Sequence, residues 1–238
     1  MENNITDKDL RIYHYGDSYA DELNIDCSNK SILDFGCNSG RLLFSFPEDL
    51  NCSYTGVDVQ KTFIDELTIQ YSNYNFVHFN KYHPSYNFYG NKVINLSDIL
   101  HDTYDIIFAW NVFTHCSYTY TLPILSDLQS MLNENGYIIF NLYSPEKLIE
   151  LSPVIKKNVE RSDDIDINTK TWIDSVREFS ERMYWENTDN IIYDEEIDNN
   201  TEKTQLFSAY KLSWIQENNP TWELLRNENN IYTFKIGA

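Results

Sequence analysis

The stretch SILDFGCNSGRLLF, residues 31–44, decides the fold. Its apolar beginning, SILDFG, predicts a buried strand, and the following GRLLFSF predicts a helix that ends before a proline. Gly36 and Gly40 lie between the two elements, four residues apart. A chain that leaves a buried strand through such a turn brings its backbone close to a ligand.

Strands and helices alternate outward from this stretch. Alternation at this spacing implies parallel pairing with right-handed crossovers, and therefore an α/β fold with a doubly wound, mostly parallel sheet. Seven strands are expected, the last two forming an antiparallel C-terminal hairpin. The further expected strands are 52–58, 75–79, 102–110, 136–143, 221–227 and 230–237, and the further expected helices are 60–71, 121–133 and 208–217.

The chain of 238 residues is long enough for one such domain, so we expect a single domain over 1–238. Residues 1–30 are polar and aromatic, and they are expected to form an N-terminal lid or helical segment. Residues 144–205 break the alternation and are expected to be an insertion that covers the acceptor site.

Composition excludes several classes of partner. The chain carries 37 acidic against 18 basic residues, a net charge of −19, which disfavours nucleic acid as a principal partner. No apolar run approaches the roughly 20 residues of a membrane helix, and the start shows no secretory signal. The four cysteines form no C-x-x-C pair and show no zinc-like spacing with histidine. We therefore expect a cytoplasmic protein without membrane contact or a metal site.

The glycine spacing selects among ligands. A dinucleotide fingerprint would place glycines at 36, 38 and 41, where this chain has Gly36, Asn38 and Arg41. Positions 36, 38 and 40 fit better, as Gly, Asn and Gly, which is the pattern of a nucleoside ligand without a pyrophosphate. Asparagine tolerates a left-handed backbone better than other non-glycine residues, so Asn38 is compatible with this turn.

Polar and aromatic residues follow the other strands at the same expected edge of the sheet. Asp58, beside Val59, ends the second strand, where a carboxylate accepts both hydroxyls of a ribose. Asn80 ends the third strand and is a candidate acceptor for an adenine amino group. Trp110 and Asn111 end the fourth strand beside the same crevice.

At this point the chain resembles the class I methyltransferases that depend on S-adenosylmethionine. DFGCNSG is similar to the family's first motif, GVDV to its ribose-binding acid, DIIFAWNVFTH to its fourth-strand motif and MLNENGYIIF to the segment before the fifth strand. The resemblance covers about residues 31–143 and implies S-adenosylmethionine as cofactor. It further implies that Asp34 and Gly36 lie near the methionine amino group. Asn38, Asn80 and Asn135 depart from the family's usual residues.

Catalytic candidates come from the same edge of the sheet. His115 follows the fourth strand and, with an ordinary pKa near 6.5, is the candidate general base for a hydroxyl acceptor; the alternative is a packing histidine. His83 is a candidate for the lining of the acceptor pocket. Tyr15 and Tyr13 are candidates to face the sulfonium as a lid, and ordinary packing is the alternative.

The sequence therefore predicts a methyltransferase that acts on an oxygen of a small polar acceptor. YHPSYNFYGNK followed by NVFTH resembles bacterial methyltransferases that modify glycans and small molecules, which implies a sugar, an activated sugar or a capsule precursor. Two alternatives stay open: an NAD-dependent oxidoreductase and a non-catalytic binding protein that keeps the cofactor fold.

Overall fold

The computed structural model describes residues 25–47, 50–83, 86–116, 118–142, 191–193, 208–210, 212–228 and 231–236. The predictions for Tyr13 and Tyr15, and for almost all of the 144–205 insertion, concern residues outside these ranges.

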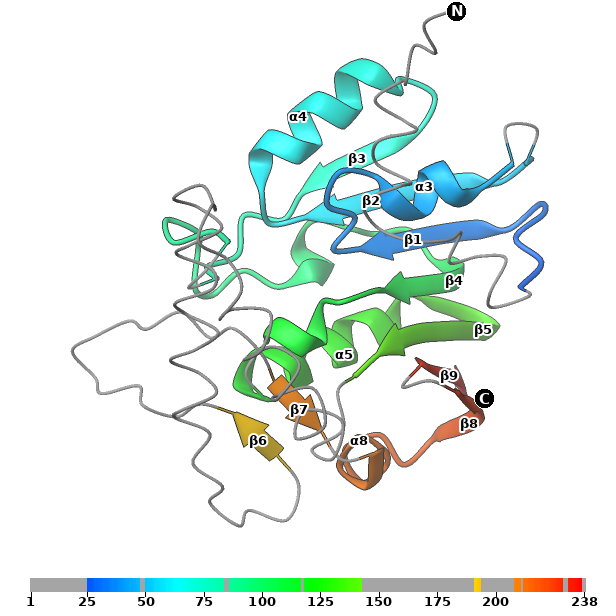
Figure 1. The fold of residues 1–238 in the computed structure, drawn as a ribbon, viewed down its shortest axis with the longest axis vertical. Coiled ribbons are helices and arrows are strands. Elements are labelled where there is room, and N and C mark those ends of the chain that lie inside the picture. Colours follow the sequence, from blue (N-terminus) through cyan, green and yellow to red (C-terminus); the bar gives the residue numbers. More distant parts are fainter. Residues whose placement is uncertain are drawn as a thin grey trace, which may run out of the picture.

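A seven-stranded mixed sheet forms the centre of the molecule, in the order β3-β2-β1-β4-β5-β9-β8 (Figure 1). Its first five strands pair in parallel, and β9 pairs antiparallel with both β5 and β8. The predicted doubly wound sheet with an antiparallel C-terminal hairpin is confirmed. The strands are β1 (Ser31–Phe35), β2 (Ser53–Asp58), β3 (Asn75–His78), β4 (Tyr104–Ala109), β5 (Leu132–Asn141), β8 (Trp222–Glu228) and β9 (Ile231–Ile236).

The strand order reverses between β1 and β4. The chain runs from β1 outward to β2 and β3, then returns to place β4 on the other side of β1. In open α/β sheets, ligands bind outside the carboxyl ends of the strands at such a switch point. The turn after β1 and the segment after β4 are therefore neighbours at this edge.

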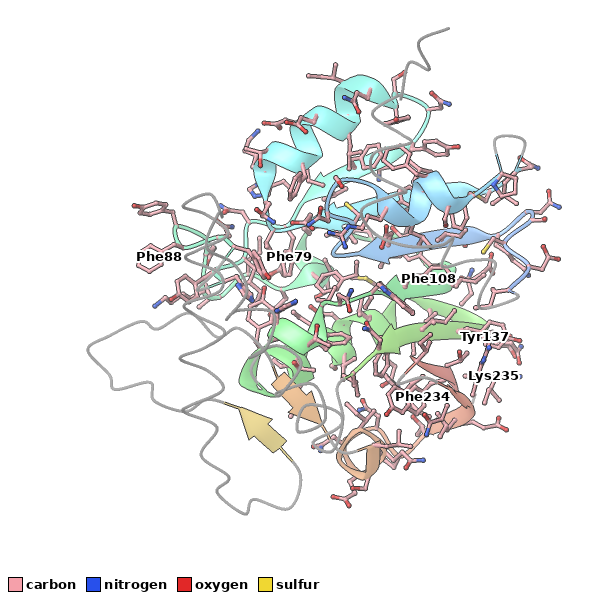
Figure 2. The ribbon with its side chains drawn as sticks, in the orientation of Figure 1. Phe79, Phe88, Phe108, Tyr137, Phe234 and Lys235 are labelled. Carbon is pink, nitrogen blue, oxygen red and sulfur yellow. The ribbon has the colours of Figure 1, made fainter. Side chains whose placement is uncertain are left out.

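Two apolar layers cover the sheet because alternate residues of each strand face opposite sides. Ile32 packs with α3 (Arg41–Ser45) on one face, where α4 (Lys61–Gln70) adds a smaller cluster. Leu33 packs on the other face with α5 (Tyr118–Ser130). Figure 2 shows Phe108 inside the parallel part of the sheet and Phe234 among the C-terminal strands.

The apolar face of α4 differs from the sequence prediction. The sequence pattern predicts a face of Phe63, Leu67 and either Ile69 or Tyr71. Leu67 is buried as expected, but the other buried residue of the helix is Ile64, and Ile69 is 83% exposed. Ile64 and Leu67 are three residues apart and share a helix face. Ile69 is two residues after Leu67 and so lies on a different face. The prediction is therefore wrong for Ile69, whereas its alternative, Tyr71, packs against the cluster that contains Leu67.

Helix α5 and strand β5 both begin earlier than predicted. The helix predicted to begin at residue 121 starts at Tyr118, and Thr121 is buried inside it. Strand β5 starts at Leu132 and not at the predicted residue 136, and the segment that contains Asn135 forms an irregularity in its pairing with β4. Asn135 has φ 64°, a left-handed conformation that asparagine tolerates.

The C-terminal region confirms the hairpin and corrects the helix before it. Residues predicted to begin a helix at 208 instead form β7 (Ser208–Tyr210), which pairs antiparallel with β6 (Ile191–Tyr193). The helix itself, α8, spans Leu212–Asn218. Tyr137 of β5 lies opposite Lys235 of β9, as Figure 2 shows.

Across the described parts of the chain, every helix is too short or too polar to span a membrane.

Candidate functional site

The turn after β1 takes three left-handed residues. Gly36 has φ 80°, Asn38 has φ 48° and Gly40 has φ 84°. A Cβ atom at position 36 would lie 2.3 Å from Cγ2 of Val112, so any side chain there would force Val112 to move. The predicted use of asparagine where a glycine is usual is confirmed at Asn38. The backbone of this turn is therefore accessible to a ligand bound at the carboxyl end of β1.

Asp58, at the end of β2, has a carboxylate that the backbone holds in place. The Asn38 N–H donates to Oδ2 at 2.9 Å, and the Gln60 N–H donates to Oδ1 at 2.8 Å. The side chain is buried at 7% exposure, and this burial raises its pKa, whereas the backbone amides of Gln60, Asn38 and Val59 lower it. One bond on each oxygen leaves further lone pairs for a ligand that brings two hydroxyl donors.

Asp34 is a second buried carboxyl group, near the end of β1. Tyr54 of β2 donates its hydroxyl to Oδ2 at 2.6 Å. Burial raises the pKa of Asp34 to about 7, the Tyr54 hydroxyl lowers it, and the nearby Asp58 raises it. The other oxygen, Oδ1, has no hydrogen bond recorded within the described residues. Asp34 is thus an acid that changes charge near neutral pH at the base of the site.

The segment after β4 is fixed by an exchange of two hydrogen bonds. The Asn111 N–H donates to Oδ1 of Asn141 at 2.6 Å, and Nδ2 of Asn141 donates to Oδ1 of Asn111 at 2.5 Å. Asn111 has φ 55°, so it too is left-handed. This contact joins the ends of β4 and β5 and sets the position of Trp110 and Val112 on either side.

These groups surround a cavity of about 240 Å³ at the switch point. Most of the residues predicted from the sequence line it together, although they come from four different strand ends. The predicted residues that line it are Asp34, Gly36, Asn38, Asp58, Val59, Trp110, Asn111, His115 and His83.

Two of the predicted cofactor residues do not line this cavity. Gly40 precedes α3, and a Cβ there would lie 3.0 Å from Leu67 Cδ2, so position 40 packs closely against α4 and its cofactor contact stays a prediction. Asn80 is exposed, and its side-chain oxygen accepts a hydrogen bond from Asn87 at 3.1 Å. The adenine contact predicted for Asn80 gains no support from this position.

A cluster of four rings, which we call the ring cluster, forms one side of the cavity: His83, Tyr86, His115 and Tyr120. The Tyr86 ring lies 4.8 Å from that of His83 and 5.8 Å from that of His115, centre to centre. Tyr120, at the start of α5, meets His83 edge-on at 5.5 Å. Burial raises the pKa of both phenols, so they are uncharged at neutral pH.

His83 has a defined tautomer within this cluster. Its Nδ1 accepts the Tyr86 N–H at 3.3 Å and so carries no proton. Its Nε2 lies 3.1 Å from the carbonyl oxygen of His115 and therefore carries the proton that it donates. Burial lowers the pKa of His83 to about 4, although the bond to the His115 carbonyl opposes this. His83 is therefore neutral, and its hydrogen bonds connect the loop after β3 to the segment after β4.

Sequence reasoning missed several lining residues, among them Arg41, Gln60, Tyr86 and Tyr120. Gln60 follows Asp58 by two residues, a spacing typical of a carboxylate that accepts a nearby backbone N–H, so a signal existed. Tyr86 and Tyr120 gave no local signal, because only the folded chain brings their loops to His83. Within the described ranges, no group of three His, Cys, Asp or Glu side chains is placed to hold a metal.

Comparisons with known proteins agree with this geometry. Residues 33–138 match the family model described as a methyltransferase domain. No curated protein matches the chain.

Solved structures share the fold at low sequence identity. The PH0226 protein from Pyrococcus horikoshii OT3 has a TM-score of 0.55 at 15% identity, with 98% of this chain and 94% of that chain covered. An S-adenosylmethionine-dependent methyltransferase from Clostridium acetobutylicum ATCC 824 has 0.50 at 13%, with 97% and 91% covered. The pyocyanin biosynthetic protein PhzM has 0.52 at 9%, with 92% and 53% covered, so the chain spans about half its length. The fold is that of the Rossmann-like methyltransferases.

Proposed function

We propose that this chain, a class I methyltransferase domain over residues 33–138, binds S-adenosylmethionine and transfers its methyl group to a small-molecule acceptor. The fit of the cavity to that cofactor supports the proposed activity. The cofactor supplies a methyl group on a positively charged sulfur, which becomes neutral when the methyl leaves. The protein has to bind the cofactor and the acceptor, align them with each other and exclude water.

The observation that carries this proposal is the carboxylate of Asp58. It is buried at the carboxyl end of β2, oriented by the amides of Asn38 and Gln60, and lines the cavity beside the glycine turn. A ribose brings two adjacent hydroxyl donors, and the two carboxylate oxygens of Asp58 are matched acceptors. Hydrogen bonds to a charged group contribute about 1.5–3 kcal/mol each.

The other end of the cofactor fits the turn after β1. Asp34 offers a buried carboxyl oxygen in the same cavity, which suits an ammonium group. Gly36 presents bare backbone because Val112 fills the space that any side chain would need. The lining therefore contains hydrogen-bond acceptors for both a ribose and an amino group. At Gly36 it also contains bare backbone that the ligand can approach closely.

A nicotinamide dinucleotide fits this turn less well. Its pyrophosphate needs close backbone approach and close helix packing at the second and third glycine positions. Asn38 and Arg41 occupy those positions here, and both line the cavity. The geometry therefore favours a nucleoside without a pyrophosphate.

In this proposal, His115 is the general base for an acceptor hydroxyl. It lines the cavity after β4, and its backbone carbonyl is held by His83. As the acceptor oxygen bonds to the methyl carbon and the sulfur–carbon bond breaks, the His115 imidazole takes the hydroxyl proton. General base catalysis raises the rate by about 10²–10⁴-fold. Alignment contributes more, because it lowers the activation barrier by about 7–11 kcal/mol.

The ring cluster is the part of the cavity that we propose binds the methyl acceptor. Its four rings offer apolar faces with polar edges, a lining suited to a polar ring such as a sugar. Oxygen methylation of a sugar or glycan precursor is the acceptor class we propose. A cytoplasmic location is part of the proposal, supported by four free cysteines.

Calorimetric titration tests the binding half of the proposal. S-adenosylmethionine and S-adenosylhomocysteine should bind, and NAD should not. Binding of NAD alone would contradict the assignment in favour of an oxidoreductase.

Methyl transfer from labelled cofactor to a panel of sugars, nucleotide sugars, phenols and amines tests the catalytic half. Label should enter a hydroxylated sugar. Transfer only to phenols or amines would contradict the acceptor class, and binding without transfer to any of them would favour the non-catalytic alternative.

A further inference from the structure

Asn141 is absent from the cavity lining, yet it determines the position of a residue that lines it. It ends β5 and exchanges two hydrogen bonds with Asn111, which follows β4. One of these bonds satisfies a backbone N–H, so it constrains the main chain and not only a side chain. Both residues are partly buried, where such bonds are less weakened by water.

The constrained residue has an unfavourable backbone conformation. Asn111 has φ 55°, which costs free energy for any residue other than glycine, although asparagine bears it better than most. Such a conformation persists only where surrounding contacts impose it. In the described structure, both side-chain hydrogen bonds that Asn111 takes part in are made with Asn141.

The consequence reaches the glycine turn through the next residue. Val112 follows Asn111, and its Cγ2 lies where a Cβ of Gly36 would be, 2.3 Å from that position. A chain of contacts therefore runs from Asn141 through Asn111 and Val112 to Gly36. These residues follow or end β5, β4 and β1, which are neighbours in the sheet.

We propose that Asn141 is a positioning residue of the cofactor site: it holds Asn111 left-handed and so keeps the wall formed by residues 110–112 against the turn after β1. The inference rests on the proposed function, because it assigns the cavity to the cofactor. It adds a residue from β5, a strand in which sequence analysis identified no candidate site residue.

Asn141→Leu is the direct test, because leucine has a similar size and makes neither bond. Loss of two hydrogen bonds predicts S-adenosylhomocysteine binding about 10–100-fold weaker by calorimetry. Asn141→Ala also removes both bonds and serves if the leucine variant does not fold. Asn141→Asp keeps an acceptor for the Asn111 N–H and should recover most of the affinity.

Asn133→Leu is the matched control. Asn133 lies at the other end of β5, where its Nδ2 donates to Asp105 of β4 at 3.0 Å. The control loses a similar β5-to-β4 bond far from the cavity, so it should lower the melting temperature and leave binding unchanged.

Three results would overturn the inference: Asn141 variants that bind as tightly as the parent, an aspartate variant as weak as the leucine one, or an equal loss in the Asn133 control. Failure of the parent protein to bind would instead contradict the proposed function, so the two failures are distinguishable.

Discussion

Tyr54 donates a hydrogen bond of 2.6 Å to the buried carboxyl group of Asp34, and this pair sets the charge at the base of the cavity. Burial raises the pKa of Asp34 to about 7, and the Tyr54 hydroxyl keeps it from rising further. Asp34 is therefore protonated below neutral pH and ionised above it. An ammonium group binds the ionised form.

Cofactor affinity should consequently depend on pH. S-adenosylhomocysteine binding should weaken about tenfold per pH unit below pH 7, as Asp34 takes up a proton. It should weaken again well above pH 8, where the ligand's amino group loses its charge. Calorimetry from pH 5.5 to 9 measures this profile, and a flat profile below pH 7 would exclude the ion pair.

Tyr54→Phe should shift that profile. The variant removes the one hydrogen bond that lowers the pKa of Asp34, so the acidic limb should move to higher pH. Asp34→Asn should abolish the acidic limb altogether. A Tyr54→Phe profile that moves to lower pH would contradict the role given to the hydroxyl.

Gly36→Ala should impair both stability and binding. The new methyl group would lie 2.3 Å from Cγ2 of Val112, and the backbone φ of 80° disfavours any side chain. We expect a loss of about 1–3 kcal/mol in the free energy of unfolding, measured by urea denaturation. Adding Val112→Ala should recover part of this loss, because it relieves the clash but not the backbone strain. No recovery in the double variant would mean that the clash contributes nothing.

His83 should remain neutral in acid. The folded protein lowers its pKa from 6.5 to about 4, so below pH 6.5 the unfolded chain binds a proton that the folded one does not. His83 thus stabilises the fold above pH 6.5, and this contribution is lost as the pH falls towards 4. At pH 5 the loss is about 2 kcal/mol.

His83→Gln tests this because glutamine retains a donor for the His115 carbonyl without titrating. Between pH 7 and pH 5, the parent should lose about 2 kcal/mol more stability than the variant. The comparison between the two proteins cancels the opposite effect of Asp34. Equal losses in both would contradict the neutral state of His83.

His115→Ala should lower turnover by about 10²–10⁴-fold and leave S-adenosylhomocysteine affinity unchanged. The reason is that the imidazole is assigned to the acceptor proton and not to the cofactor. His101→Ala serves as the control, since it removes an exposed imidazole that precedes β4, at the opposite edge of the sheet from the cavity. Turnover within a few-fold of the parent would remove His115 as the base.

The fold and the cofactor half of the site were predictable because both follow from local patterns. Strand ends bearing Asp34, Asp58 and Asn111 meet at one edge whenever parallel strands are wound this way. Asparagine at left-handed positions was likewise predictable from its conformational tolerance, as Asn38 and Asn135 show.

What the sequence could not reveal depends on contacts between distant segments. Asn141 meets Asn111 across 30 residues, and His83 meets the His115 carbonyl across 32, with no motif that links either pair. The pairing of residues 208–210 with 191–193 is equally non-local, which is why a helical pattern was preferred there. The exposed Ile69 shows that apolar identity alone does not fix a helix face.

The central claim is that the Asp58 carboxylate holds the ribose of an adenosine ligand. The most direct measurement is calorimetric titration of S-adenosylhomocysteine into the parent, Asp58→Ala and Asp65→Ala proteins. Asp65 is an exposed carboxylate on α4 paired with Lys61, so its removal changes charge without touching the cavity. We expect Asp58→Ala to weaken binding by about one to three orders of magnitude and Asp65→Ala to leave it unchanged. Equal affinity in all three proteins would contradict the account.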